Sequence, residues 1–356
     1  MRNTNKLFQK KLLLWFHSNK RDLPFRDVKD PYKIWLSEVM LQQTQVNTVL
    51  PYFNKWIKKY PTIKSVANED YDILLKYWEG LGYYSRCLNF YKACKIIVNN
   101  FDGLVPNKWS YLRDLPGVGD YTASAVLSIA FNQKYVAIDG NVKRVMSRYL
   151  GIKNVTSNNL KRIKTFLEEH ILEKETGNFN QSIMELGAII CRPKNPKCQE
   201  CPISLNCIGY LKTQPENYPN PKNYKAKPHH VIVAGVFWRN KLFYIQKRDE
   251  KGMLGGLWEF PGGKVEKNET LISALNRKIK EECGVSPMIK EKVGVINHRY
   301  SHFSITFHVY NCMEEKKKIK EAKLSAWIAP EQISQYAFPK ANHKIFKIIS
   351  DRGWCA

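Results

Sequence analysis

Four cysteines in one short stretch are the residues of this 356-residue chain with the clearest capacity for chemistry. Six, two and five residues separate them in turn: Cys191, Cys198, Cys201 and Cys207. Thiolates this close in sequence can converge on one centre, either a four-thiolate zinc ion or a [4Fe-4S] cluster. A structural zinc ribbon usually has two separated C-x2-C pairs, whereas here one C-x2-C lies between longer arms. The spacing therefore favours the cluster.

A glycine-containing turn precedes the cysteines. Gly117 and Gly119 lie in the run Leu115 to Gly119, and a helical pattern follows from Asp120. Glycine lets the backbone turn sharply and expose its N–H groups. Those groups, at the positive end of the next helix, can hold a DNA phosphate without reading the base sequence. We therefore predict a helix-hairpin-helix element at about residues 111–130.

The charge of the chain favours a polyanionic partner. Lys and Arg outnumber Asp and Glu by 57 to 32, a formal net charge of +25, which points to nucleic acid rather than to a merely solvated basic surface. Residues 1–11 are polar and basic rather than a signal peptide, and no segment has the ~20 apolar residues of a membrane span. We expect a cytoplasmic protein with no membrane partner, where reduced thiols favour ligation over disulfides.

Two domains must position these residues. Apolar residues at three and four spacing indicate helices in the ranges 12–16, 35–53 and 163–172, so residues 1–211 are expected to be all-α. The segment 212–228 holds four prolines and no aliphatic run, and it is predicted to be an extended linker.

The remaining residues, 229–356, have an α+β pattern. Strands are expected at 231–238 and 242–246, joined across Arg239, Asn240 and Lys241 as a hairpin. A helix at about 269–283 follows, and further strands lie near 293–297 and 303–310. The charged run 314–323 is expected to be a solvated loop.

Together, the turn, the cysteine spacing and Asp139, eighteen positions after Tyr121, resemble the endonuclease III superfamily of DNA glycosylases over roughly residues 23–207. The resemblance implies an all-α glycosylase fold with an iron-sulfur cluster loop at 191–207. It also implies that Asp139 faces the sugar of an extruded nucleotide and stabilises the positive charge that develops as the glycosidic bond breaks. By itself, an Asp before Gly is more often a turn or cap residue.

The run Pro31 to Val46 is similar to the N-terminal motif of the A/G-specific adenine DNA glycosylase (MutY) family. The resemblance implies that Glu38 is the general acid that protonates N7 of adenine, a poor leaving group. Burial is expected to raise the pKa of Glu38, while Asp139 stays ionised.

Tyr121 distinguishes two chemistries within the superfamily. Relatives with lyase activity carry a lysine here, whose amine forms a Schiff base, and a phenol cannot do so. The resemblance therefore implies a monofunctional enzyme that removes adenine mispaired with 8-oxoguanine or guanine from duplex DNA and leaves an abasic site. We expect it to act as a monomer, with Tyr121 hydrogen-bonded near Asp139.

Further positions match the family one at a time. Gln43 and Tyr83 match side chains that enter the duplex and fill the space left by the flipped base. Arg26 and Gln181 match positions that contact the adenine, and Asn141 matches a position near the sugar.

The run 257–266 and the residues after it resemble the MutT-type (Nudix) fold, so the C-terminal domain is expected to be a Nudix-like α/β sandwich. One required position of the family's metal-binding box departs, because Lys278 stands where a magnesium-binding Glu is expected, next to Glu281 and Glu282. A cation in place of an anionic ligand changes the charge of the site by two units and opposes Mg²⁺ binding. We therefore expect the fold without the hydrolysis.

In the adenine glycosylase family such a domain recognises 8-oxoguanine through a Phe-Ser-His motif on a loop between strands. Tyr300, Ser301 and His302 align with this motif, with Tyr in place of Phe. Donors and acceptors can distinguish 8-oxoguanine by its N7–H and O8, since an unmatched buried polar group costs about 1–3 kcal/mol.

Three alternatives remain open at this point. A bifunctional endonuclease III-type glycosylase and lyase conflicts with Tyr121. A non-catalytic iron-sulfur protein that scans DNA leaves Glu38 and Asp139 without a role. A nucleotide-pool pyrophosphatase conflicts with Lys278.

Overall fold

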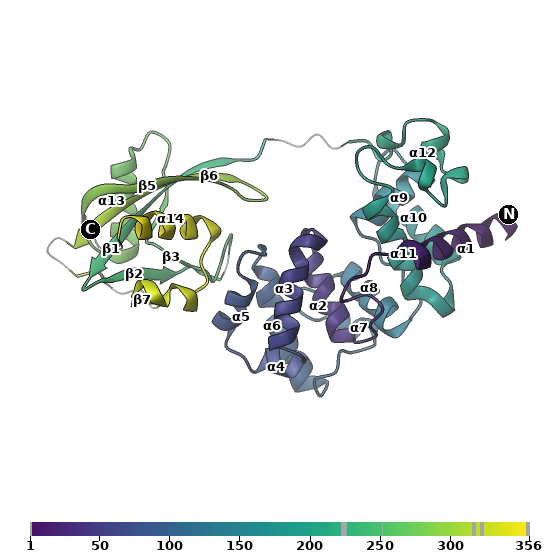
Figure 1. Ribbon diagram of the computed structural model, residues 1–356, viewed down its shortest axis with the longest axis horizontal. Helices are drawn as coiled ribbons and strands as arrows, with labels where there is room; N and C mark the ends of the chain where they lie inside the picture. Colours follow the sequence, from purple (N-terminus) through teal and green to yellow (C-terminus); the bar gives the residue numbers. More distant parts are fainter. Residues whose placement is uncertain (1, 222–225, 251, 315–317, 321–323, 354–356) are drawn as a thin grey trace. The chain divides into compact units, whose positions relative to one another are not determined.

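The computed structural model describes residues 2–221, 226–250, 252–314, 318–320 and 324–353. Contacts divide the chain into two compact units, Met1–Asn68 with Asn89–Asn223 and Glu69–Leu88 with Tyr224–Ala356. The described residues of the first unit form helices and turns, and the second unit contains a β-sheet (Figure 1). The predicted order of an all-α domain followed by an α+β domain is confirmed. The second unit also includes a short helix from the first half, α5 (Tyr71–Trp78).

Four helices of the first unit, α2 (Pro31–Leu41), α4 (Ile63–Ala67), α9 (Gly140–Tyr149) and α10 (Ser157–His170), begin after residues whose side chains cap them. Helix α2 starts with a proline, and the side chain of Asp30 accepts the N–H groups of Tyr32 and Lys33. Asp139 caps α9 in the same manner. The other α-helices are α1 (Arg2–Asn19), α3 (Val46–Lys59), α7 (Trp109–Arg113), α8 (Asp120–Phe131), α11 (Thr176–Ile189) and α12 (Ile208–Leu211), while α6 (Ser85–Asn100) spans both units.

Helix α11 organises the packing of the first unit, because it contacts α1, α8 and α9. Phe179, Ile183 and Leu186 of α11 are buried in one core with side chains of α1, α9 and α10. Gly177 lets α11 approach α8, since a Cβ there would lie 2.8 Å from the Ile129 Cα. Helix α2 packs on α8 in turn. These contacts place α2, α8, α9 and α11 around one space, which contains the candidate site.

The range 35–53, predicted helical, forms parts of two helices rather than one. Helix α2 ends at Leu41 and α3 begins at Val46. Gln43, between them, has a φ of 57°, a left-handed conformation that ends a helix and is uncommon outside glycine. The apolar periodicity of the sequence continues across this break, because each of the two helices buries an apolar face. None of the described helices combines the length and the apolar composition that a membrane span requires.

The segment predicted to be an extended linker, 212–228, begins as structure packed on the first unit. It contains a short 3-10 helix, η4 (Pro215–Asn217), and the side chain of Tyr218 is buried. The Tyr218 carbonyl accepts Arg148 Nε at 3.2 Å, and the Asn220 N–H donates to the Lys153 carbonyl at 2.7 Å. Residues 222–225 lie outside the described residues. This part of the segment packs in spite of its prolines, because burial of the Tyr218 ring removes apolar area from water.

The sheet of the second unit has seven strands, with the order β3-β2-β1-β6-β5 and with β4 and β7 pairing β1 and β2. The β1–β6 pair is parallel and the other pairs are antiparallel. The strands are β1 (His229–Arg239), β2 (Leu242–Lys247), β3 (Trp258–Glu259), β4 (Gly262–Lys264), β5 (Pro287–Arg299), β6 (Ser304–Glu314) and β7 (Ser325–Ile328). The predicted hairpin is confirmed: Asn240 and Lys241 form a two-residue turn with φ values of 49° and 64°.

Two helices cover the sheet and form the expected sandwich. The helices are α13 (Leu271–Cys283) and α14 (Lys340–Asp351) (Figure 1). Alternate residues of β1 point to opposite faces, so Val233 packs with α13 and Ala234 packs with α14. The predicted helix at 269–283 begins at Leu271, where Thr270 is the cap. Of the predicted charged loop at 314–323, residues 315–317 and 321–323 lie outside the described residues, and Ile319 is buried against the α13 face.

Candidate active site

Glu38 is the buried carboxylate of the site. It lies on α2 and its residue is 8% exposed. Burial raises the pKa of Glu38 to about 7, while a hydrogen bond from Tyr121 and the positive charge of Arg26 oppose the rise and the negative charge of Asp139 adds to it. The raised pKa and its cause agree with the expectation from the sequence. A carboxyl group of this kind holds its proton near neutral pH.

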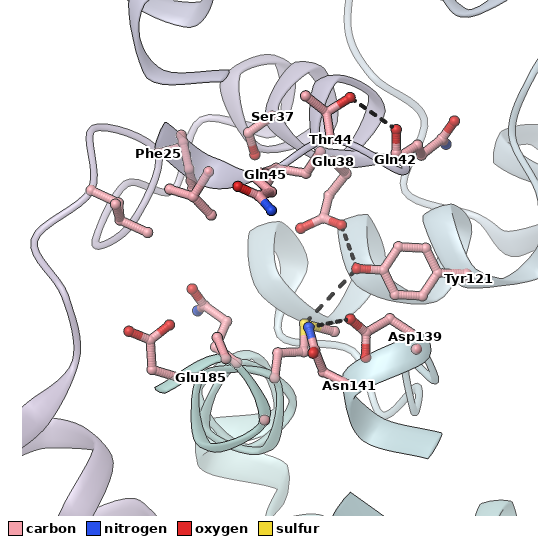
Figure 2. A pocket seen from close by; sticks show the side chains of 18 of the residues that line it. Phe25, Ser37, Glu38, Gln42, Thr44, Gln45, Tyr121, Asp139, Asn141 and Glu185 are labelled. Atoms are coloured by element: carbon pink, nitrogen blue, oxygen red, sulfur yellow. Dashed lines mark hydrogen bonds between the residues drawn. The ribbon is translucent and has the colours of Figure 1, made fainter. Parts of the chain in front are cut away.

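Tyr121 joins the hairpin to this carboxylate. Gly117 turns the chain with a φ of 76°, and Gly119 is the cap residue at which α8 begins, so Tyr121 lies in the first turn of α8. Its hydroxyl donates to Glu38 Oε2 at 2.6 Å, and Met184 Sδ lies 3.9 Å away (Figure 2). The expected hydrogen bond near Asp139 is therefore made to Glu38 instead, because α2 packs directly on α8.

Asp139 is both a helix cap and a member of the site. Its Oδ1 accepts the Val142 N–H at 2.6 Å, and its Oδ2 accepts Asn141 Nδ2 at 3.0 Å. Burial raises the pKa of Asp139, and these two hydrogen bonds and the charge of Arg144 oppose the rise. The cap interpretation and the catalytic interpretation of this Asp are thus compatible, since capping leaves the carboxylate at the pocket wall.

One pocket of about 930 Å³ brings most of the predicted residues of the first unit together (Figure 2). The predicted residues that line it are Arg26, Glu38, Gln43, Tyr121, Asp139, Asn141 and Gln181. Gly117 and Gly119 do not line it; both are exposed in the hairpin that precedes α8. A pocket of this volume has room for a nucleoside.

Sequence reasoning missed three charged residues that also line the pocket, Arg21, Arg144 and Glu185. Glu185 is 1% exposed and accepts hydrogen bonds from both Arg21 and Arg26. Arg144 Nη2 donates to Asn141 Oδ1 at 2.7 Å and its Nε donates to the Cys191 carbonyl at 2.8 Å. The one available signal was local: Glu185 lies four residues after Gln181, on the same face of α11.

The four cysteines line a single small cavity together with Arg148. Arg148 Nη1 lies 3.3 Å from Cys191 Sγ, and its guanidinium donates to the carbonyls of Arg192 and Pro193 at 2.7 and 2.9 Å. Among the described residues, no set of three or more His, Cys, Asp or Glu side chains is arranged to hold a metal ion. Four thiols around one cavity nevertheless provide the donor set of a four-iron cluster, in which each iron takes one cysteine.

Two carboxylates of the metal-binding box of the second unit are paired with cations, while Glu282 accepts hydrogen bonds from the Gln246 side chain and the Gly262 N–H. Lys278 Nζ donates to Glu281 Oε2 at 2.8 Å, and Arg277 Nη2 donates to Glu269 Oε2 at 2.7 Å. The Lys278 side chain also fills the space over Gly263, where a Cβ would lie 2.6 Å from the Lys278 Cδ. A metal ion at these carboxylates would have to displace both cations.

Tyr300, Ser301 and His302 form the turn between β5 and β6. The Tyr300 N–H donates to the Phe303 carbonyl at 2.8 Å, and Ser301 and His302 are exposed. The His302 ring packs edge-on against Tyr83 of the same unit, with centroids 5.3 Å apart. Tyr83 has a φ of 48°, so both residues expected to enter the duplex, Gln43 and Tyr83, have strained left-handed backbones.

Comparison with known proteins agrees with this geometry. Residues 36–169 match the HhH-GPD superfamily of base excision DNA repair proteins, and residues 233–347 match the NUDIX domain. A thermostable thymine-DNA glycosylase has a TM-score of 0.55 and 30% sequence identity, over 59% of this chain and 98% of its own. A trapped endonuclease III-DNA covalent intermediate has a TM-score of 0.52 at 22% identity, over 60% of this chain and 99% of its own, which shows the fold. The fold and the pocket thus define a DNA glycosylase of the helix-hairpin-helix class.

Relatives along the whole chain narrow the class. The adenine DNA glycosylase of Buchnera aphidicola (from Schizaphis graminum) is 35% identical over 96% of this chain and 99% of its own. The Homo sapiens adenine DNA glycosylase is 31% identical over 96% of this chain and 73% of its own. The chain belongs to the adenine DNA glycosylase family. It is a base excision repair enzyme that hydrolyses N-glycosyl bonds.

Proposed function

We propose that the enzyme removes adenine mispaired with 8-oxoguanine or guanine in duplex DNA and leaves an abasic site without cleaving the strand. The observation that carries the proposal is the hydrogen bond from Tyr121 to the buried Glu38, in a pocket that Asp139 also lines. This pocket combines a proton donor and an anion on one nucleoside-sized space, which hydrolysis of an N-glycosyl bond requires.

Glu38 supplies the proton in this reaction. As the C1′–N9 bond of a flipped-out deoxyadenosine lengthens, negative charge develops on the base and Glu38 protonates N7. A pKa of about 7 suits this task, because the group is protonated in the free enzyme and still acidic enough to transfer its proton. The Tyr121 hydroxyl, 2.6 Å from Oε2, stabilises the carboxylate that forms.

Asp139 stabilises the sugar as it gains positive charge. The Val142 N–H and Asn141 Nδ2 orient its two oxygens and favour the ionised form over the protonated form. Water then adds to C1′ and gives up a proton to the Glu38 carboxylate, which restores the acid and completes the hydrolysis. Tyr121 has no amine to form a Schiff base, which supports base removal alone, although Lys143 also lines the pocket.

The partner base and the cluster complete the proposal. Ser301 and His302, exposed on their turn, are proposed to contact 8-oxoguanine, and Arg26 and Gln181 to contact the adenine. Cys191, Cys198, Cys201 and Cys207 would hold a [4Fe-4S] cluster, which cross-links the loop through its iron-sulfur bonds. Thiolate ligands need a reducing compartment, so we propose a cytoplasmic location. We also propose that the enzyme binds DNA as a monomer.

One assay tests the reaction. A duplex with adenine opposite 8-oxoguanine, labelled on the adenine strand, is incubated with the enzyme and analysed by gel electrophoresis with and without alkali. Strand cleavage only after alkali is expected; cleavage without alkali would show a lyase, and no cleavage in either lane would reject the substrate. Iron and sulfide analysis of protein purified without air tests the cluster, where equal amounts of the two are expected and zinc would contradict it.

A further inference from the structure

One carboxylate in the pocket wall accepts hydrogen bonds from two arginines. None of its described contacts is with Glu38 or Asp139. Glu185, on α11, is 1% exposed. Its Oε1 accepts the Arg21 N–H and Arg21 Nε at 3.0 and 2.7 Å. Its Oε2 accepts Arg21 Nη2 and Arg26 Nη2 at 2.9 and 3.0 Å. Burial alone would raise the pKa of Glu185, but the hydrogen bonds from Arg21 and Arg26 hold it at about 2, so Glu185 stays ionised.

Arg26 connects this carboxylate to the general acid. Its side chain is 9% exposed, it lines the pocket with Glu38, and its positive charge favours the ionised form of Glu38. Among the described residues its buried Nε has no hydrogen-bond partner, which leaves one donor of Arg26 without an acceptor in the protein. The Arg26 guanidinium can therefore contribute to nucleotide binding, but its positive charge also lowers the pKa of Glu38.

We propose that Glu185 is a positioning residue that offsets one of the two positive charges of Arg21 and Arg26, so that both guanidinium groups form the pocket wall while Glu38 keeps its proton. The inference rests on the proposed role of Glu38 as the acid. Glu185 reaches the reaction only through the two arginines.

The other charged groups around Glu38 do not replace Glu185 in this role. Asp139, from the N-terminus of α9, and Tyr121, from α8, face Glu38 directly. Lys143 and Arg144 of α9 also line the pocket, and Arg144 is held by Asn141 Oδ1 and the Gly187 carbonyl at 2.7 Å each. Loss of the Glu185 charge therefore leaves two guanidinium groups of the pocket wall without their carboxylate partner.

The test is the pH dependence of single-turnover adenine excision by the full-length enzyme. The protonated form of Glu38 is the active form, so the rate falls as the pH rises through its pKa, at about 7. In Glu185→Gln the uncompensated cations favour the carboxylate form of Glu38. The falling limb of the pH–rate profile is expected to move about one pH unit toward acid relative to the unsubstituted parent enzyme. This shift lowers the rate at pH 8 about tenfold and leaves the rate at pH 5.5 close to that of the parent.

Three variants separate charge from packing. Glu185→Asp keeps the charge and is expected to keep the limb within about 0.3 pH units of the parent, with weaker DNA binding because the shorter side chain reaches the arginines less well. Glu185→Gln combined with Arg21→Gln restores the balance and returns the limb toward pH 7. Glu175→Gln is the matched control: it removes an exposed carboxylate, paired with His17, just before the same helix, and leaves the limb in place.

A limb that stays at the parent's pH in folded Glu185→Gln would overturn the inference. If that variant does not fold, Arg21→Gln decides, since the Arg21 side chain is 36% exposed and its removal takes one positive charge from the pocket wall, where Glu185 then pairs with Arg26 alone. The limb then moves toward alkaline pH, and an unmoved limb rejects the inference. The proposed function fails separately: if the parent's limb persists in the residual activity of Glu38→Gln, Glu38 is not the acid.

Discussion

Two carboxylates of the helical unit, Glu38 and Asp139, and two of the Nudix-like unit, Glu269 and Glu281, have pKa values shifted in opposite directions. Glu282 of the Nudix-like unit is an exception, because burial raises its pKa as in the helical unit. In the helical unit, burial raises the pKa of Glu38 to about 7 and raises that of Asp139. In the Nudix-like unit, hydrogen bonds from Arg277 lower the pKa of Glu269 to about 2, and a hydrogen bond from Lys278 lowers that of Glu281. Burial thus raises the pKa of a carboxyl group, and a hydrogen-bonded cation lowers it.

We propose that the helical unit carries out the chemistry and that the Nudix-like unit takes part in recognition. A buried carboxyl group with a phenol as its partner can donate a proton, whereas exposed carboxylates already paired with cations offer little to Mg²⁺. What the second unit retains for a function is an exposed turn at Ser301 and His302. Four experiments test this difference between the two units.

The largest effect is expected from the carboxylates of the helical unit. Glu38→Gln removes the proton donor and Asp139→Asn removes the anion that faces the sugar, so each is expected to lower the single-turnover excision rate by about 10²–10⁴-fold. DNA affinity, measured by fluorescence anisotropy, should change little because neither side chain binds phosphate in the proposed mechanism. Unchanged turnover in either variant would reject the assignment.

The second effect belongs to the exposed turn. The double variant Ser301→Ala, His302→Ala is expected to lose about 10–100-fold of the preference for adenine opposite 8-oxoguanine over adenine opposite guanine, since each lost hydrogen bond to a desolvated base is worth about 1–3 kcal/mol. The ratio of the two excision rates measures it. Full retention of the preference would place recognition of 8-oxoguanine elsewhere.

A smaller effect is expected from the phenol. Tyr121→Phe removes the hydrogen bond that stabilises the Glu38 carboxylate, so the pKa of Glu38 should rise and the falling limb of the pH–rate profile should move toward alkaline pH. At acid pH, where Glu38 is protonated in both forms, the rate should fall by no more than about tenfold. A shift of the limb toward acid would contradict the proposed role of Tyr121.

The smallest effect on excision is expected from Lys278→Glu. It removes the cation that fills the space over Gly263 and adds a carboxylate, so Mg²⁺ should raise the melting temperature of the variant but not that of the parent. Adenine excision should stay within about twofold, because the pocket residues all lie in the helical unit. Nucleotide hydrolysis by the parent with Mg²⁺ would remove the contrast between the carboxylates of the two units.

Much of this could be predicted because the signals are local. The cysteine spacing, the glycine turn, the cap at Asp139 and the hairpin at Asn240 each depend on a few consecutive residues. The packed start of the segment 212–228 was missed because its proline content suggested an extended chain, and one buried tyrosine, Tyr218, decided otherwise.

The sequence by itself determined the family and the candidate acid and anion. It also determined that position 121 is a tyrosine rather than a lysine and that position 278 of the metal-binding box is a lysine rather than a glutamate. Only the tertiary structure decided which groups share a proton or a charge. Tyr121 donates to Glu38 across 83 residues, and Glu185 pairs with Arg21 across 164. Such pairs leave no periodic pattern in the chain, because their energy comes from burial and charge that exist only after α2, α8 and α11 have packed around one pocket.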